Sequence, residues 1–285
     1  MTHNVLQGRV AVMATMHGKE AAFGPPLVKQ LGLSLVLPHQ IDTDALGTFT
    51  GEVARAGTIE EAACKKAALG MDISGCDLGL ASEGAYGPHP HLPLLPAGFE
   101  VAALLDRRTG QVVIEKMADE APTYDHITLA PGEDVRPFLA RIGFPAQRVI
   151  IKAGAGDSGP CIAKGIGDFE DFETSRYAAQ RAACDGMVFV QTDMRACFNP
   201  RRMDVLGMLA QKLTTRLATP CPTCAAPGFG LLHVERGLPC KWCAGPTLLA
   251  RSEIWGCTLC QTSEERGRGD GQTEADPGSC PRCNP

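Results

Sequence analysis

Eight of the thirteen cysteines in this 285-residue chain form four Cys-x-x-Cys pairs close to the C-terminus. The pairs are Cys221/Cys224, Cys240/Cys243, Cys257/Cys260 and Cys280/Cys283. Two intervening residues let both thiolates of a pair face one metal ion, and four thiolates complete the closed tetrahedral shell of a structural zinc. Disulfide frameworks are typical of small secreted proteins, so this clustering favours metal. We therefore expect two structural zinc ions in a zinc-ribbon module.

The spacing of the pairs bears on which of them share an ion. Fifteen residues separate the first pair from the second and nineteen separate the third from the fourth, and both spacings suit a zinc ribbon. This predicts sequential pairing. A crossed arrangement, with loops of 32 and 36 residues, stays open. Short strands are expected at residues 230–235 and 247–251, and a flexible polar loop at 263–276.

A second group of polar residues, 191–202, follows an apolar run and leads into a helical pattern. Asn199 suits the N-cap of that helix, and Pro200 suits its first turn. The arginines Arg195, Arg201 and Arg202, next to free backbone N–H groups, would form a phosphate site. In the alternative reading, Asp193 pairs with Arg195 or Arg201 and braces the loop.

Two further loops carry groups suited to phosphate chemistry. In residues 80–91, Glu83 stands where an apolar strand is expected to end, and a carboxylate there could hold Mg²⁺ against phosphates. His89 and His91 would share one face of an extended segment, as metal ligands or as ordinary loop residues. After the first expected strand, Lys19 could reach a phosphate, or it could belong to a solvated helical turn interrupted at Pro25.

The remaining pattern of residues 1–218 alternates apolar runs with helical stretches. Strands are expected at residues 9–14, 33–37, 101–105, 112–114, 148–151 and 187–190. Helices are expected at residues 59–69, 133–142, 175–184 and 200–217. This alternation predicts an α/β domain with a mixed sheet and flanking helices over residues 1–218, followed by the double zinc-ribbon module at residues 219–285. The glycine-rich run at 153–160 lacks the Gly-Lys-Ser/Thr of a P-loop and is expected to be a flexible loop.

Composition limits the class of function. Apolar residues make up 44% of the chain, charged residues 21%, and the formal net charge is -5, which argues against a broad nucleic-acid-binding surface. From residue 219 onward the chain has six Lys/Arg and seven Asp/Glu. The zinc tail therefore has no excess of basic residues that would favour nucleic acid. No window resembles a membrane span or a targeting segment, and we expect a cytoplasmic protein. The lone cysteines are expected in the core, with a nucleophilic Cys161 or Cys197 as the alternative.

Two family resemblances add to this reading. The segments MATMHGKE, GTFTGEV, LASEGAYGPHP, QTDMRACFNPRRM and CPTCAAPGFG resemble an uncharacterised bacterial domain-of-unknown-function family with a C-terminal zinc ribbon. More remotely, the first hundred residues are similar to the inosine-triphosphate pyrophosphatase family, which hydrolyses non-canonical purine nucleoside triphosphates with Mg²⁺. The matching positions are Thr15, His17 and Lys19, then Gly57-Thr58 and Ala62 to Ala67, then Ser82-Glu83-Gly84. This resemblance implies a metal-binding role for Glu83 and a phosphate-binding role for the lysines.

The leading hypothesis is therefore a Mg²⁺-assisted phosphoanhydride hydrolase acting on a nucleotide or a similar phosphorylated small molecule. Its catalytic residues would be Glu83, Asp193 and Lys19, and phosphate would be bound by Lys19, Arg195, Arg201 and Arg202. The rival hypothesis is a non-catalytic adaptor that binds a nucleotide or protein and uses the zinc ribbons to contact its partner. RNA binding through the ribbons is a third reading, against which the near-neutral tail counts.

Overall fold

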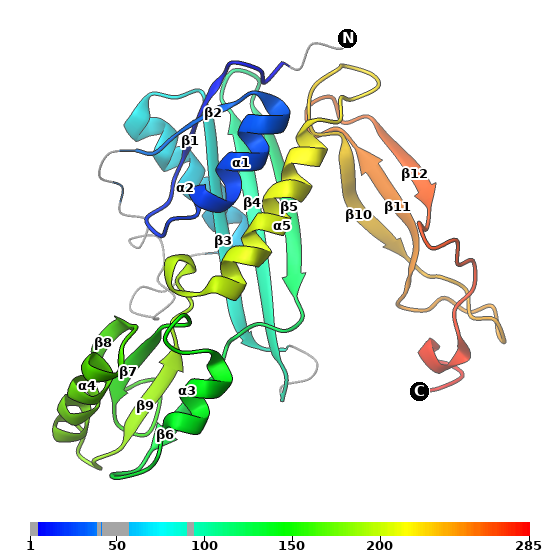
Figure 1. Cartoon of the computed structure of the whole chain (residues 1–285). Coiled ribbons are helices and arrows are strands. Elements are labelled where there is room, and N and C mark those ends of the chain that lie inside the picture. The colour runs from blue at the N-terminus through cyan, green and yellow to red at the C-terminus, as the bar shows by residue number, and fades with distance from the viewer. Residues whose placement is uncertain (1–4, 39–40, 42–56, 90–93) are drawn as a thin grey trace.

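The computed structural model describes residues 5–38, 41, 57–89 and 94–285, and it arranges them around three separate sheets (Figure 1). Two sheets lie within residues 1–218, and the third belongs to the cysteine-rich tail. Helices cover the first two sheets, which confirms the predicted α/β class with a mixed sheet. The single domain expected for residues 1–218 is thus built on two sheets with their own apolar cores.

The first sheet has the strand order β2-β1-β3-β4-β5. Its strands are β1 (Val10–Met13), β2 (Ser34–Val36), β3 (Leu78–Pro88), β4 (Pro96–Asp106) and β5 (Gln111–Asp119). Strand β1 runs parallel to both β2 and β3, while β3, β4 and β5 form an antiparallel meander. Because β1 stops at Met13 and β3 continues to Pro88, no strand of the described residues pairs with one edge of β3 beyond Leu80.

Three helices sandwich this sheet: α1 (Glu20–Leu31), α2 (Ile59–Ser74) and α5 (Pro200–Leu217). Helices α1 and α5 share one face, where Phe23 and Leu27 of α1 join Leu209 of α5 in the largest core. Their spacing along each helix turns one apolar stripe toward the sheet. Helix α2 covers the opposite face, and Thr58 and Glu61 form a capping box at its start that satisfies free N–H groups there.

The second sheet has the order β6-β9-β7-β8, and every neighbouring pair in it is antiparallel. It consists of β6 (His126–Leu129), β7 (Val149–Ala153), β8 (Cys161–Ile166) and β9 (Val188–Thr192), with helices α3 (Arg136–Ile142) and α4 (Phe169–Ala182). The chain enters this second unit after β5 and returns from β9 through the short 3-10 helix η2 (Ala196–Phe198) into α5. The start of α5 therefore lies at the junction of the two units (Figure 1).

The tail contains the antiparallel sheet β10-β11-β12, with β10 at Gly230–Arg236, β11 at Ala250–Gly256 and β12 at Ser263–Gly267, and the short 3-10 helix η3 at Pro277–Ser279. It projects from the end of α5 as an arm beside the first sheet (Figure 1). The strand expected at 230–235 is confirmed. The loop expected at 263–276 is wrong in its first part, because β12 pairs with β11 from Ser263 to Gly267.

Two other expectations need correction. Helix α1 is not interrupted at Pro25 and Pro26 but continues to Leu31, where its buried residues hold it against the sheet. Glu83 does not terminate a strand: β3 pairs with β4 continuously from Leu78 to Pro88. The polar character of residues 82–87 suggested an end, but the partner strand supplies the hydrogen bonds that a terminus would lack. Glu83 lies instead where β3 has passed the end of β1.

Candidate functional site

Buried charged side chains gather where β3 extends beyond the carboxyl end of β1. Lys19, at the start of α1, is 6% exposed and its Nζ donates to the backbone carbonyl of Ser82 at 2.8 Å. That carbonyl belongs to the part of β3 beyond Met13, so the lysine supplies a donor next to the strand's open edge. The carboxyl ends of parallel strands are the usual place for ligands in α/β folds, which makes this edge the candidate site.

On the α2 side of the sheet, Glu83 is 2% exposed and pairs with Lys66, which is 7% exposed. The Lys66 Nζ lies 2.6 Å from Glu83 Oε2. Glu83 and Val101 are register partners, so they share the face that contacts α2. The ion pair thus ties the middle of α2 to the edge of β3.

On the α5 side, Arg202 and Glu100 form a fully buried ion pair, with 2.5 Å between Arg202 Nε and Glu100 Oε1. Tyr86 donates its hydroxyl to the same Glu100 oxygen at 2.8 Å, and its ring lies 5.3 Å from the guanidinium carbon. Gly84 packs against this ion pair. A Cβ at position 84 would come within 2.5 Å of Glu100 and 2.8 Å of Arg202, so glycine leaves the space that the pair occupies. Sequence analysis missed Glu100, which stands inside an otherwise apolar strand.

The electrostatics of this cluster are unusual for a protein interior. Burial, reinforced by the nearby positive charge of Arg202, lowers the pKa of Lys19 to about 8. Burial and the negative charge of Glu100 raise the pKa of Tyr86. Within the described part of the chain, Ser82 Oγ and Glu100 Oε2 are buried and have no hydrogen-bond partner. Buried polar atoms are normally satisfied, so these two oxygens are candidates to accept a hydrogen bond from a water or a ligand.

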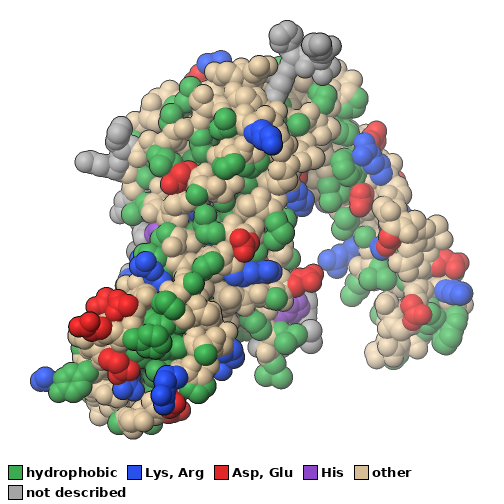
Figure 2. Space-filling view, viewed as in Figure 1, with side chains coloured by type: hydrophobic (Ala, Val, Ile, Leu, Met, Phe, Trp, Pro, Cys, Tyr) green, Lys and Arg blue, Asp and Glu red, His purple; other side chains and the backbone are tan. Residues whose placement is uncertain are grey.

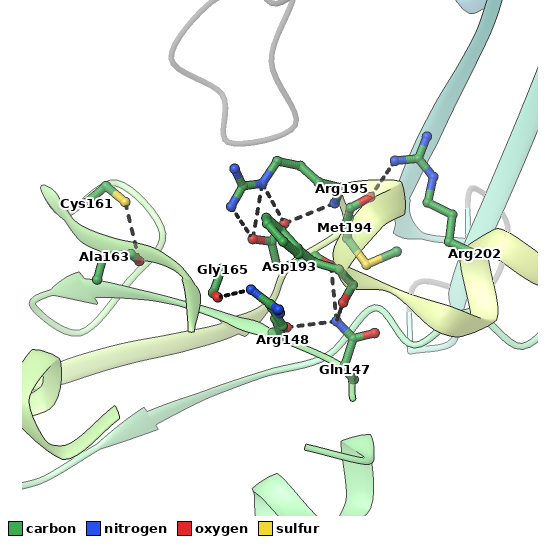
Figure 3. Close-up of polar contacts among 10 residues, drawn as sticks. Gln147, Arg148, Cys161, Ala163, Gly165, Asp193, Met194, Arg195 and Arg202 are labelled. Atoms are coloured by element: carbon green, nitrogen blue, oxygen red, sulfur yellow. Dashed lines mark hydrogen bonds and ion pairs between the residues drawn. The ribbon is translucent and has the colours of Figure 1, made fainter. Parts of the chain in front are cut away.

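The loop at 191–202 does not gather its three arginines at one point. Arg195 donates to both carboxylate oxygens of Asp193, the shortest contact being 2.5 Å, while Arg202 turns away toward the first sheet (Figure 3). Arg201 pairs with Asp119 at 2.8 Å. Each guanidinium therefore meets a different carboxylate, and the bracing role considered for Asp193 is the one observed. Because both oxygens of Asp193 accept from Arg195, this residue is not brought to Glu83 as a metal ligand.

The helix start in this loop is as predicted. Asn199 caps α5 by accepting from the backbone N–H of Arg202, and Pro200 occupies the first turn. The Met194 carbonyl accepts from Arg202 (Figure 3), so the cap and the following arginine anchor the loop together. Of the two histidines considered as metal ligands, His89 is described and half-buried, while His91 lies outside the described residues, as does the whole segment GTFTGEV at residues 47–53.

The cysteine pairs meet in crossed fashion, and the sequential pairing predicted from their spacing is wrong. The first set is Cys221, Cys224, Cys257 and Cys260, and the second is Cys240, Cys243, Cys280 and Cys283. Each Cys-x-x-Cys pair forms a tight turn, here called a knuckle. Hydrogen bonds between β10 and β11 bring the first and third knuckles to one end of the sheet. The second and fourth knuckles lie at the other end. These are the only groups of three or more metal-ligating side chains among the described residues.

Both sets have dimensions that fit zinc. Sulfur–sulfur distances are 3.7 Å for Cys221–Cys260 and Cys224–Cys257, and 3.9 and 3.7 Å for Cys240–Cys283 and Cys243–Cys280. A tetrahedral ion with Zn–S bonds of about 2.3 Å requires about 3.8 Å between sulfurs. Each set could therefore hold one metal ion such as zinc.

The knuckles repeat one local geometry. The residue after the second cysteine donates its N–H to the carbonyl of the first, as Ala225 does to Cys221 at 2.9 Å and Ala244 does to Cys240 at 2.8 Å. Ala225, Ala244 and Gln261 have positive φ, a conformation that side-chain-bearing residues seldom adopt. The tight turn directs both thiolates of each pair to one side.

The first metal set is docked on the body, and close contacts define that interface. Gln111 of β5 donates to the carbonyl of Pro227 at 2.8 Å. Arg216 of α5 donates to the carbonyl of Gly228 at 3.0 Å and pairs with Glu115 at 3.0 Å. A Cβ on Gly228 would come within 2.7 Å of Val113, so the knuckle's backbone approaches β5 as closely as glycine allows.

A family model described as a domain of unknown function, DUF6671, matches residues 64–285 of the chain. The chain belongs to this family. The match covers Lys66, Glu83, Glu100 and Arg202 together with both cysteine sets, whereas Lys19 precedes it. The match thus includes most of the buried cluster and the entire cysteine-rich tail, which confirms the resemblance to a domain-of-unknown-function family, and the two cysteine sets fit a zinc-binding module.

Neither the curated proteins nor the solved structures yielded a match, and the remote resemblance to the inosine-triphosphate pyrophosphatase family is not supported by them. No helix in the described part of the chain is long and apolar enough to cross a membrane.

Proposed function

We propose that this DUF6671 protein is a phosphoanhydride hydrolase that acts, with Mg²⁺, on a nucleotide or a similar phosphorylated small molecule. The observation that carries the proposal is the charge balance of the buried cluster. Three cations, Lys19, Lys66 and Arg202, lie with only two carboxylates, Glu83 and Glu100. A net positive charge in a protein interior is costly unless an anion compensates it, and a phosphate oxygen provides that compensation.

A partly exposed loop lies next to the cluster. Lys19 follows the loop 15–18, in which Met16 is exposed and His17 and Gly18 are half-buried. A phosphate entering along this loop would first meet Lys19, whose ammonium group offers donors beyond the one used by the Ser82 carbonyl. Lys19 and Arg202 would then hold the phosphate oxygens, and Lys66 would orient Glu83 through their ion pair.

The proposed magnesium ion would lie at Glu83, whose Oε2 pairs with Lys66. Mg²⁺ prefers oxygen ligands and is commonly held by one or two carboxylates together with substrate phosphates and water. Glu83 would hold the ion. Ser82 Oγ and Glu100 Oε2 lack hydrogen-bond partners within the described residues and lie on the opposite face of the sheet from Glu83, so they would accept from water beside Lys19 and Arg202. When bound, the ion would supply positive charge to the phosphate oxygens and lower the pKa of the attacking water.

In the proposed reaction, the oxygen of water forms a bond to phosphorus and the bridging P–O bond breaks. The departing phosphate leaves with the electron pair of that bond, and the proton released by the water passes to bulk solvent. Lys19 and Arg202 would stabilise the negative charge that develops on the oxygens. Asp193 has no place in this scheme, because its carboxylate is bound to Arg195.

The test is phosphate or pyrophosphate release from a panel of canonical and deaminated nucleoside triphosphates, with Mg²⁺ and with EDTA. We expect metal-dependent release over multiple turnovers that falls at least a hundredfold in Glu83→Gln and Lys19→Ala. Arg136→Ala is the matched control, because Arg136 is an exposed arginine paired with Asp134 on the second unit. Release that is equal in wild type and Glu83→Gln, or absent with every substrate, would refute the hydrolase.

A second function is favoured by one observation on the tail. Trp242, inside the second knuckle, is 77% exposed and Leu248 is 73% exposed, both on the part of the arm that holds the second cysteine set. Apolar side chains at such positions suit a protein partner. In this adaptor the α/β units would bind a nucleotide or protein without turnover. Stoichiometric complex formation on gel filtration, lost in Trp242→Ala, would support the adaptor instead.

A further inference from the structure

A groove of about 330 Å³ lies between the body and the arm, and strands of both line it. The lining includes Val112, Ile114 and Lys116 of β5 together with Leu231 and Leu232 of β10. Each of these strands is the last in its sheet, and no strand of the described residues pairs with its outer edge (Figure 1). Two edge strands therefore border one groove.

The outer edge of β5 offers backbone groups to a further strand. The carbonyls of Ile114 and Lys116 accept from Arg216 at 2.9 Å and from Lys212 at 2.8 Å, so these two carbonyls point away from β4. The N–H of a strand residue points to the same side as its carbonyl, so the N–H groups of Ile114 and Lys116 face outward as well. The nine residues of β5 contain no proline and pair with β4 without a bulge, and these are two of the features that commonly block strand addition.

The apolar side chains of the groove suit an extended peptide. Leu231 and Leu232 are 36% and 42% exposed, and Val112 and Ile114 in the same groove are half-buried. Exposed apolar side chains that gather in one place commonly mark a binding surface. Because an extended chain places alternate side chains on the same side, apolar residues at every second position of a peptide would cover these four.

The charges of the groove favour an acidic peptide. Glu115 is shared by Lys212 and Arg216, at 2.9 and 3.0 Å, and Glu60 pairs with Lys116 at 2.5 Å. Three cations thus meet two carboxylates among the residues that line the groove. The side chains of Lys116 and Lys212 are 63% and 49% exposed, so a carboxylate of a partner can reach both ammonium groups.

We propose that this groove binds an extended acidic segment of a partner protein, which adds as a strand to β5. Apolar residues at every second position would contact Leu231 and Leu232, and an acidic residue would bind Lys116 or Lys212. Main-chain hydrogen bonds would supply affinity and the side-chain contacts would supply selectivity. This inference goes beyond the proposed function and does not depend on hydrolysis, because the groove is lined by none of the residues of the buried cluster.

Selection of eight-residue peptides from a random displayed library on the full chain, with zinc present, tests the inference. We expect the enriched peptides to alternate apolar with polar residues, to carry an acidic residue and to lack central prolines. A labelled peptide of this kind should bind Leu232→Asp at least tenfold more weakly than wild type, as measured by fluorescence polarisation. Leu248→Asp is the matched control, because Leu248 is an exposed leucine of the same arm that does not line the groove.

A second pair of variants tests the role of the β5 backbone. Lys116→Pro and Lys116→Ala both lose the ammonium group, but only proline also lacks the outward N–H. Proline is tolerated on an edge strand where that N–H does not belong to the sheet. We expect at least tenfold weaker peptide binding by Lys116→Pro than by Lys116→Ala, and Leu232→Asp keeps the test independent of any effect of proline on folding.

Enrichment of basic or proline-rich peptides, or of none, would overturn the inference, and so would equal binding by Leu232→Asp and Leu248→Asp. A wild type that light scattering shows to be a dimer, and that Leu232→Asp converts to a monomer, would also overturn it, because the groove would then hold a second copy of the chain. A chain that hydrolyses no nucleotide but binds the peptide through Leu232 would lose the proposed hydrolase and keep this site.

Discussion

Lys19 shows how burial of a charged group opposes the stability of the folded chain. Its pKa falls from 10.5 to about 8, so between these pH values the unfolded chain holds a proton that the folded chain has released. The free energy of unfolding of the wild type should therefore rise with pH in this window. The shift corresponds to about 3 kcal/mol, which is present as a destabilisation at pH 7.

Lys19→Met should remove that pH dependence. The variant keeps the length of the side chain without the charge, and we expect it to be about 1–2 kcal/mol more stable than wild type at pH 7 once the lost bond to Ser82 is counted. Near pH 10.5 the difference should vanish or reverse. Urea denaturation of both proteins at pH 7 to 10.5 measures it, and parallel curves would contradict the burial argument.

The Arg202–Glu100 pair is stabilising only while both partners are present. Glu100→Ala leaves a fully buried guanidinium without its carboxylate, which should lower the free energy of unfolding by about 3–5 kcal/mol. Disruption of the pair Arg136–Asp134 by Arg136→Ala should change the free energy of unfolding very little, because both side chains are exposed to solvent. The denaturant midpoints of the two variants measure this difference. Similar decreases in the free energy of unfolding would mean that the buried pair does not hold α5 in place.

At the level of elements, the contact between the first knuckle and β5 depends on one glycine. Gly228 has φ +89° and approaches Val113 so closely that a Cβ would lie 2.7 Å from it. Gly228→Ala should lower stability by about 2–4 kcal/mol, of which about 1–2 kcal/mol is backbone strain and the rest is overlap with β5.

Gly237→Ala is the control for this prediction. Gly237 also has positive φ, +108°, but a Cβ there meets nothing closer than 3.7 Å, so only the strain applies. Hydrogen exchange of β5 residues should increase in Gly228→Ala and not in Gly237→Ala. Equal effects in the two variants would show that the close approach to Val113 is unimportant for docking of the arm.

For the whole molecule, the two metal sets should have different consequences when removed. Zinc content should be two per chain and should fall to one in Cys221→Ser/Cys257→Ser and in Cys240→Ser/Cys280→Ser. Only the first double variant should increase hydrogen exchange in the α/β body, because Gln111 and Arg216 of the body contact the first knuckle and its neighbours. Nothing comparable joins the second set to the body in the described residues.

Hydrogen–deuterium exchange followed by mass spectrometry can separate these outcomes. Faster exchange is expected over residues 111–116 and 212–217 after loss of the first site, with those segments unchanged after loss of the second. Exchange that responds equally to both losses would mean that the arm behaves as one unit.

The surface charge of the molecule is mixed on the face drawn in Figure 2. Acidic and basic side chains are intermixed there over the body and the arm. This agrees with the near-neutral tail, and no broad basic surface is present on this side.

Several features follow from local chemistry, and these were accessible from the sequence. The cysteine spacing identified the eight ligands because a knuckle needs only neighbouring residues. Asn199 and Pro200 marked the start of α5, since capping is decided within one turn. Apolar periodicity located most helices and central strands and indicated the mixed sheet.

The tertiary structure alone decided which distant residues meet. Cys221 shares its set with Cys257 rather than Cys240 because the pairing of β10 with β11 brings those knuckles together, and loop length alone penalises longer connections only weakly. Glu83 faces Lys66, and Arg202 faces Glu100 across about a hundred residues, because the order of strands places β3 and β4 between α2 and α5. The sequence thus determined which groups could bind metal or phosphate, while packing determined which of them act together, since ion pairs and metal shells depend on distances that strand order sets.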